Sequence, residues 1–153
     1  MRHRVQGIMI QNGKAILGYG CVDKINKTFR HYFIGGGIET VETPEDAILR
    51  EVMEAANVKG NIVFKFNKEI EKNSTTFLVD IGDQKPTLGY DPEEINEDLH
   101  QRSLQKLIFI PLKDKDDFTN IDINYFNVLL SECKVRNYYP KWYEELLELT
   151  VNY

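Results

Sequence analysis

The stretch "GGGIETVETPEDAILREVMEAANV", residues 35–58, decides the fold of this chain. Three glycines lead into a helix signal, because Thr43 is a good N-cap residue and Pro44 suits the first helical position. A helical wheel with about 100° per residue places most apolar residues on one face: Ile48, Leu49, Val52, Met53, Ala55 and Ala56. Asn57 tolerates the left-handed conformation that often ends a helix. The stretch therefore predicts a glycine-rich turn followed by an amphipathic helix.

The polar face of this predicted helix carries Arg50, Glu51 and Glu54. Glu51 and Glu54 are three residues apart, so their carboxylates lie near each other on one flank. Adjacent carboxylates repel unless a proton or a cation intervenes, and hard cations such as Mg²⁺ prefer oxygen ligands of this kind. An ordinary solvated helix also carries such residues, and a glycine-rich loop alone is a weak signal. Two interpretations remain open at this point, a metal and phosphate site or a tight turn before an ordinary helix.

The remainder of the chain predicts six strands and two further helices. Alternating, β-branched and aromatic patterns predict the strands at residues 4–11, 14–20, 27–34, 60–70, 74–81 and 106–112. Asn12-Gly13 between the first two is a strong hairpin signal. The helices are expected at 117–133 and 140–151, and the polar, acidic segment 82–105 is expected to be a long loop. This order predicts a mixed sheet with helices packed on it.

Composition limits the class of protein. The 153 residues suit one domain, so we expect a single domain over 1–153. The net charge of −5, from 24 acidic and 19 basic residues, argues against a broad nucleic-acid surface but leaves room for a small nucleotide held through a cation. Cys21 and Cys133 form no zinc spacing and no disulfide framework. With no apolar run of membrane-spanning length and no signal-peptide pattern, we expect no membrane association and a cytoplasmic location.

The spacing within the opening stretch resembles the signature of the Nudix hydrolases. That pattern is Gly, five residues, Glu, seven residues, Arg-Glu, an aliphatic residue, any residue, Glu-Glu, any residue, Gly and an aliphatic residue. The chain matches it at Gly36, Glu42, Arg50, Glu51, Val52, Glu54 and Val58. A long spaced motif in a strand–loop–helix context is far more specific than a short one. The resemblance implies an α+β fold, an α-β-α sandwich with a mixed central sheet flanked by helices.

Four residues depart from the family pattern. Ala55 stands where the second Glu of the Glu-Glu pair is expected, and in the family that Glu is usually a metal ligand. Asn57 replaces Gly, which its role as a C-cap explains. Ile34 replaces a frequent Pro and Val41 a frequent loop Gly, and we expect both to alter only the backbone of the loop.

The family resemblance also implies a chemistry. Nudix enzymes use water to cleave a nucleoside diphosphate linked to another group, with Mg²⁺ or Mn²⁺ to polarise the phosphate and activate the water. By resemblance, Glu51 and Glu54 are metal ligands and the Gly35 carbonyl supplies another oxygen. Arg50 and Glu42 would hold the loop against the helix. The implied substrate is a small nucleotide-type molecule, and because relatives are often dimers, a homodimer is possible.

Many Nudix enzymes also use a carboxylate from a later loop, as a ligand or as a general base. In this chain Glu93 is the first candidate, because "LGYDPE" resembles a turn seen in relatives, and Glu94 and Glu97 follow. For any one of these acids, a solvated loop position is the commoner role. Such a carboxylate would partly compensate for Ala55.

Substrate contacts are expected from Arg30, Gly36 and Gly37. Arg4 and Lys14 are weaker candidates for phosphate contacts, and for Arg30 and both of these a surface position is the commoner role. Four aromatic residues near the C-terminus suit packing, base stacking or a dimer contact: Tyr138, Tyr139, Trp142 and Tyr143.

Two functions follow from the resemblance. The first is a metal-dependent hydrolase that cleaves a pyrophosphate bond, which Arg50, Glu51 and Glu54 favour. The alternative is a catalytically impaired domain that binds a nucleotide or phosphorylated ligand, which Ala55 favours. A structural domain without a ligand would leave the long match to the Nudix pattern unexplained.

Overall fold

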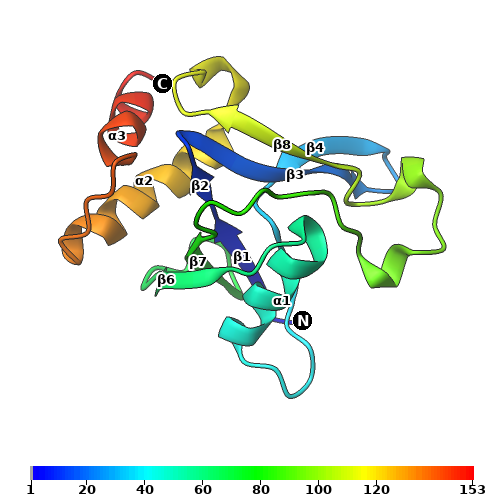
Figure 1. Ribbon diagram of the computed structural model, residues 1–153. Coiled ribbons are helices and arrows are strands. Elements are labelled where there is room, and N and C mark those ends of the chain that lie inside the picture. Colours follow the sequence, from blue (N-terminus) through cyan, green and yellow to red (C-terminus); the bar gives the residue numbers. More distant parts are fainter. Residues whose placement is uncertain (1) are drawn as a thin grey trace.

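The computed structural model describes residues 2–153, and these residues form two four-stranded sheets (Figure 1). The first sheet has the order β5 (Gly35–Gly37), β1 (Arg4–Ile8), β7 (Ser74–Asp80) and β6 (Asn61–Lys65). In the second sheet, β3 (Lys14–Asp23) pairs with β2 (Ile10–Gln11), β4 (Thr28–Tyr32) and β8 (Lys106–Pro111). The pairing of β1 with β7 is parallel and the other pairings are antiparallel, so the architecture is mixed as predicted.

The first predicted strand, 4–11, belongs to both sheets. β1 ends at Ile8 beside β7, and β2 begins at Ile10 beside β3. Between them the Met9 carbonyl accepts a hydrogen bond from the Ile16 amide at 3.0 Å. The expected hairpin follows at once, with φ of 52° at Asn12 and 71° at Gly13. One continuous apolar pattern thus serves two sheets, because its partners change along its length.

The three helices cover opposite sides of the first sheet. They are α1 (Pro44–Ala56), α2 (Asn120–Val135) and α3 (Tyr143–Val151). Side chains alternate along β7, so Phe77 and Val79 belong to the buried cluster under α1, whereas Leu78 belongs to the cluster under α2 and α3. This is the predicted α-β-α sandwich, and Figure 1 shows α1 well separated from the α2–α3 pair.

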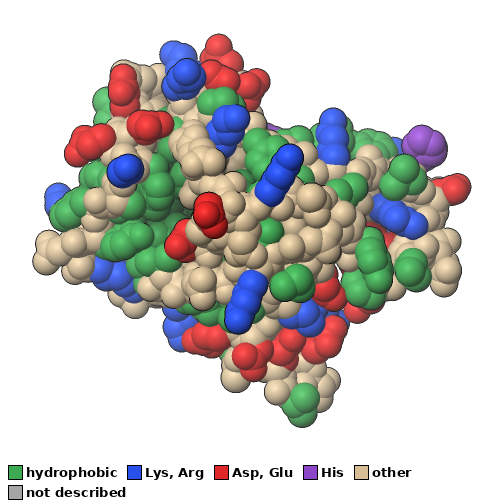
Figure 2. Space-filling model, in the orientation of Figure 1, with side chains coloured by type: hydrophobic (Ala, Val, Ile, Leu, Met, Phe, Trp, Pro, Cys, Tyr) green, Lys and Arg blue, Asp and Glu red, His purple; other side chains and the backbone are tan. Residues whose placement is uncertain are grey.

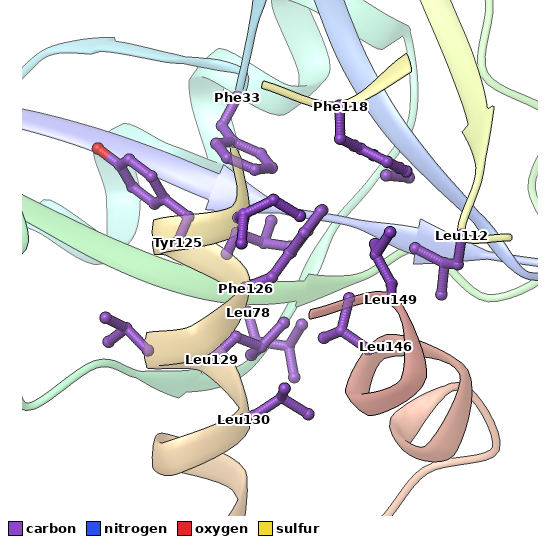
Figure 3. Packing of buried hydrophobic residues seen from close by; sticks show 14 of the residues in the cluster. Phe33, Leu78, Leu112, Phe118, Tyr125, Phe126, Leu129, Leu130, Leu146 and Leu149 are labelled. Atoms are coloured by element: carbon purple, nitrogen blue, oxygen red, sulfur yellow. The ribbon is translucent and has the colours of Figure 1, made fainter. Parts of the chain in front are cut away.

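The cluster under α2 and α3 is rich in aromatic rings (Figure 3). Phe126 makes edge-to-face contacts with Phe33 at 5.7 Å and with Phe118 at 5.3 Å between ring centroids. Leu146 and Leu149 of α3 are buried against the same group. The cluster therefore fixes α2 against the end of β4, which the site described below requires.

Helix α1 has the ends that the sequence predicts. The Thr43 hydroxyl accepts a hydrogen bond from the Asp46 amide at 3.1 Å, and Asn57 closes the helix with φ of 55°. The apolar face is buried as expected except at Met53, whose side chain is 46% exposed. Helix α3 starts at Tyr143 and not at the expected Pro140, because residues 140–143 form a separate turn. None of the helices described for residues 2–153 has the length and apolar character needed to cross a membrane.

Val41 lies in a conformation that suits glycine. Its φ is 76° and its side chain is fully exposed, so no burial compensates for the crowding of its branched Cβ. A non-glycine residue in this region costs about 1–3 kcal/mol, and glycine costs about 0.5–1 kcal/mol in unfolded-chain entropy. Valine at position 41 therefore lowers the stability of the fold, because the backbone of the loop adopts a conformation that favours glycine.

We expect Val41→Gly to raise the free energy of unfolding by about 1 kcal/mol, because glycine removes the strain at positive φ. Urea denaturation of the two proteins measures the difference. Val41→Ala, which keeps a Cβ, serves as the control and is expected to gain less. A glycine variant less stable than the parent would contradict the strain.

Candidate active site

A cavity of about 840 Å³ opens between α1, the edge strand β5, β1, β4 and the first turn of α2. Its lining includes the main site residues expected from the sequence: Arg30, Gly35, Gly36, Gly37, Arg50, Glu51, Glu54 and Glu93. The weaker candidate Arg4 lines it too, whereas Lys14, Glu94 and Glu97 do not. The structure therefore brings the main candidates to one place. Their individual roles remain predictions.

Arg50 connects the glycine strand, the loop before α1 and the helix itself. Its Nε and Nη2 donate to the two carboxylate oxygens of Glu42 at 2.6 and 3.0 Å, and this pairing holds the pKa of Glu42 below its usual range. Nη1 donates to Glu51 at 3.1 Å and to Glu54 at 2.9 Å, and Nη2 also donates to the Gly37 carbonyl at 3.2 Å. Arg50 is therefore much more than a surface ion pair, and it fixes the shape of the site.

The glycines allow α1 to approach β5. A Cβ atom on Gly36 would collide with the carboxylate of Glu51, so only glycine lets that side chain lie against the strand. In the β1–β5 pairing, Gly7 donates to the Ile34 carbonyl, which places Gly35 at a position where the ladder makes no hydrogen bond. Because β5 is an edge strand, the β1–β5 ladder does not use the Gly35 carbonyl, and its role as a metal ligand stays a prediction.

The environment of Glu51 disfavours the ionised form of its carboxyl group. Its pKa is raised to about 7, chiefly by burial and also by the nearby charges of Glu54 and Asp91, and Arg50 opposes this rise only in part. Its side chain is 20% exposed, so solvent does not screen these interactions fully. An ionised Glu51 is thus costly in the free protein, and a bound cation would relieve that cost.

The pKa of Glu51 predicts a pH-dependent stability. A carboxyl whose folded-state pKa is raised stabilises the fold below its unfolded pKa of about 4.5, and this contribution is lost as the pH rises through about 7. In metal-free buffer, we expect the stability of Glu51→Gln relative to the parent to be about 2 kcal/mol more favourable at pH 8 than at pH 5. Urea denaturation at both pH values measures this. An identical difference at the two pH values would show that Glu51 titrates normally.

Ala55 lies beside the two carboxylates but points into a narrow space. The residue is 8% exposed and borders a small cavity of about 40 Å³. Glu51, Glu54 and Asp91 border the same cavity. The position that lacks the family's carboxylate is therefore covered by the long loop.

The acids of segment 82–105 divide into two groups. Glu94 accepts hydrogen bonds from Ser103 and pairs with Lys24 at 2.9 Å, and Glu97 also pairs with Lys24, so both are engaged away from Glu51. Glu93 lines the large cavity, and its role as a ligand or general base stays a prediction. Asp91 lines both cavities and was not singled out by the sequence. Its position directly before Pro92, where an acid commonly caps a turn, was the available signal.

The oxygen donors of the cavity suit a divalent cation whose remaining ligands are supplied by other molecules. Across residues 2–153, no three Asp, Glu, His or Cys side chains converge as the ligands of a preformed metal cluster do. Glu51 and Glu54 supply two carboxylates, and the Gly35 carbonyl faces away from β1. Mg²⁺ is commonly bound by one or two carboxylates with substrate phosphates and water as its remaining ligands. These residues therefore fit a cation that arrives with a phosphate group.

Basic residues and a histidine also line the cavity. Arg2, Arg4 and Arg30 line it, and the first of these was not anticipated from the sequence. His31, to which the sequence assigns no role, has Nε2 at 2.6 Å from the buried carboxylate of Asp122, which also accepts from the Thr119 amide that begins α2. The lining of the cavity thus combines basic side chains with the acids of α1.

The aromatic residues near the C-terminus lie elsewhere. Tyr139 and Tyr143 make an edge-to-face contact at 4.9 Å, Tyr138 packs on Phe64, and Trp142 packs against the cluster under α3. None of them lines the large cavity. In the described chain these residues make packing contacts outside this cavity.

No protein-family model matches the sequence, and no curated protein matches it significantly. Solved structures do match. A Nudix-family hydrolase from Clostridium perfringens is 14% identical with a TM-score of 0.55, over 87% of this chain and 94% of that chain. A MutT structure from work on Aliivibrio salmonicida and Vibrio cholerae is 18% identical with a TM-score of 0.55, over 87% and 98%. An ADP compounds hydrolase is 17% identical with a TM-score of 0.52, over 88% and 74%.

The chain therefore has the Nudix hydrolase fold. The resemblance noted in the residues 36–58 is confirmed at the level of the fold, and the stretch lies where it should, with its glycines on an edge strand and its acids on the adjacent helix. At this level of identity the comparisons show the fold alone.

Proposed function

We propose that residues 1–153 form one Nudix-like domain that hydrolyses a pyrophosphate bond in a small nucleotide-linked substrate, with Mg²⁺ or Mn²⁺ as cofactor. The single observation that carries this proposal is the acid pair Glu51 and Glu54, held by Arg50 beside the glycines of an edge strand in a large cavity. The solved structures add support, since one similar fold is described as an ADP compounds hydrolase and another as a UDP-X diphosphatase.

In this proposal some residues bind the cation or the substrate, and Arg50 positions the residues that bind the cation. Glu51 and Glu54 would hold the cation, which when bound polarises the phosphate and activates water. Arg50 is bound to two loop oxygens and two helix carboxylates, so it positions these ligands and does not contact the reacting atoms. Arg30 and Arg4 line the cavity, and their charge suits the phosphates of the substrate.

A binding module without turnover is the second candidate. Ala55 removes one carboxylate from the Nudix pattern, and the described residues contain no three-acid cluster that would hold a cation in the absence of substrate. A domain of this kind would still bind a phosphorylated ligand through Arg2, Arg4 and Arg30, which line the cavity. A cytoplasmic location and a homodimer remain predictions from the sequence.

A substrate panel with two cations tests the proposal. The panel contains nucleoside triphosphates, ADP-ribose, nucleotide sugars and dinucleoside polyphosphates, each assayed with Mg²⁺ and with Mn²⁺ for release of phosphate or nucleoside monophosphate. We expect metal-dependent turnover, and we expect Glu54→Gln to lower kcat/KM by about 100-fold or more because the cation loses a charged ligand.

The control is Glu144→Gln, which removes an exposed acid of α3 outside the cavity and should leave turnover unchanged. Metal-dependent binding of a panel member without turnover would favour the binding module. A folded protein that neither binds nor cleaves any of them would reject both functions.

A further inference from the structure

The six arginines of the chain fall into two groups. Three of them donate hydrogen bonds to carboxylate or carbonyl oxygens of the protein: Arg50, Arg102 and Arg136. The other three all line the large cavity: Arg2, Arg4 and Arg30. Among residues 2–153, none of the side chains in this second group makes a hydrogen bond or an ion pair with the protein. The unpaired arginines thus gather in one cavity, although the chain carries 24 acidic and only 19 basic residues.

The side chains of Arg2 and Arg4 are neighbours. Arg4 is paired with Gly37 in the β1–β5 ladder, and residues paired in this way point to the same face of the sheet. A Cβ atom on Gly37 would collide with the guanidinium of Arg2, so that group occupies the space beside Arg4 which a side chain at position 37 would need. The charge of Arg2 helps to lower the pKa of Glu42, but the carboxylate of Glu42 is already bonded to Arg50.

The two arginines and the acid pair lie on different faces of the edge strand β5. Val5 belongs to the buried cluster under α1, and its ladder partner Gly36 meets the carboxylate of Glu51. Successive side chains of a strand point to opposite faces, so Arg4 points away from α1. The cavity therefore borders both faces of β5, with acids on the first and arginines on the second.

Two further acids of the lining are engaged with other protein groups. Asp122 lies 2.6 Å from Nε2 of His31, and Glu71 is hydrogen-bonded to the side chain of Tyr125. Neither acid forms an ion pair with Arg2 or Arg4 in the described part of the chain. The positive charge on this face of β5 is therefore left for a ligand.

The chemistry of two adjacent guanidinium groups favours an anion with more than one charge. Like charges repel, so a dianion that lies between Arg2 and Arg4 relieves their mutual repulsion. A phosphate monoester carries about 1.5 to 2 negative charges at pH 7 and has three acceptor oxygens, which suit the paired donors of guanidinium groups. A carboxylate has a single charge and would neutralise only one of the two arginines.

We propose that Arg2 and Arg4 form a second phosphate subsite on the face of β5 that points away from α1, and that the substrate carries a phosphate monoester in addition to its pyrophosphate group. Arg30 adds positive charge to the same cavity. The statement about the substrate rests on the proposed hydrolysis. Binding of a phosphate ester at the subsite does not depend on it.

Pairs of ligands that differ by one phosphate ester test the subsite. NADP⁺ and NAD⁺ form one pair, coenzyme A and dephospho-coenzyme A form another, and all four contain a pyrophosphate bond. Affinity is measured by isothermal titration calorimetry in EDTA, so that no divalent cation supports turnover. We expect the protein to bind the phosphorylated member of each pair about tenfold more tightly.

Arginine variants locate the preference. We expect Arg2→Gln and Arg4→Gln each to lower the preference for the phosphorylated ligand about threefold, and the double variant to abolish it. Arg4→Lys keeps the charge without the paired donors, so it should retain part of the preference. Lys113→Gln removes an exposed base outside the cavity and is the matched control, which should keep the full preference.

Several results would overturn the subsite. Equal affinity within both pairs would do so, and so would a folded protein that binds neither phosphorylated ligand. A preference that survives in the double variant would show that the phosphate ester binds elsewhere. Inorganic phosphate that displaces NADP⁺ as effectively as coenzyme A does would identify free phosphate, and not an ester, as the occupant.

Hydrolysis is judged separately by the substrate panel. A preference that requires both arginines, in a protein that cleaves no panel member, would support the subsite and reject only the hydrolysis. Metal-dependent turnover together with equal affinity within both ligand pairs would support the hydrolase and reject only the subsite.

Discussion

The guanidinium of Arg50 is the contact on which the rest of the site depends. It bonds the loop through Glu42, the edge strand through the Gly37 carbonyl and the helix through Glu51 and Glu54. A planar group with several fixed donors can make all of these contacts at once, which a lysine ammonium cannot do with the same geometry. Because it only partly neutralises the two helix carboxylates, it leaves a site that still favours a cation.

The two sides of the sandwich contribute differently to function. The cluster under α1 places the acid pair against the glycines of β5, so close packing there sets the distance between helix and strand. The aromatic cluster shown in Figure 3 fixes the position of α2. Asp122 of this helix contacts His31, and both residues line the cavity. On the face drawn in Figure 2, basic and acidic side chains are interspersed, and no single basic patch dominates that face.

The departures from the Nudix pattern have different physical consequences. Val41 costs stability locally, because its backbone adopts a conformation that favours glycine. Ala55 and Asn57 are linked, because the loop that covers the first is bonded to the second. A comparison of residue types alone treats them as separate losses, whereas the contacts between loop and helix make them parts of one structural change.

The sequence by itself determined the local structure of α1 and its surroundings. Thr43 and Asn57 marked the helix ends, Asn12-Gly13 marked the hairpin, and the spacing of Arg50 and the acids predicted the site, since caps, turns and helical neighbours depend on residues close in the chain. It predicted one sheet where there are two, because one apolar strand changes partners at Met9.

Only the tertiary structure decided which distant groups meet. It placed Arg2 and His31 in the cavity, and it turned Glu94 and Glu97 towards Lys24 while leaving Asp91 beside the acid pair. Spacing along the chain cannot reveal these contacts, because they join segments tens of residues apart. Their positions follow from how the long loop is bonded to the end of α1, and no local preference of the loop encodes that path.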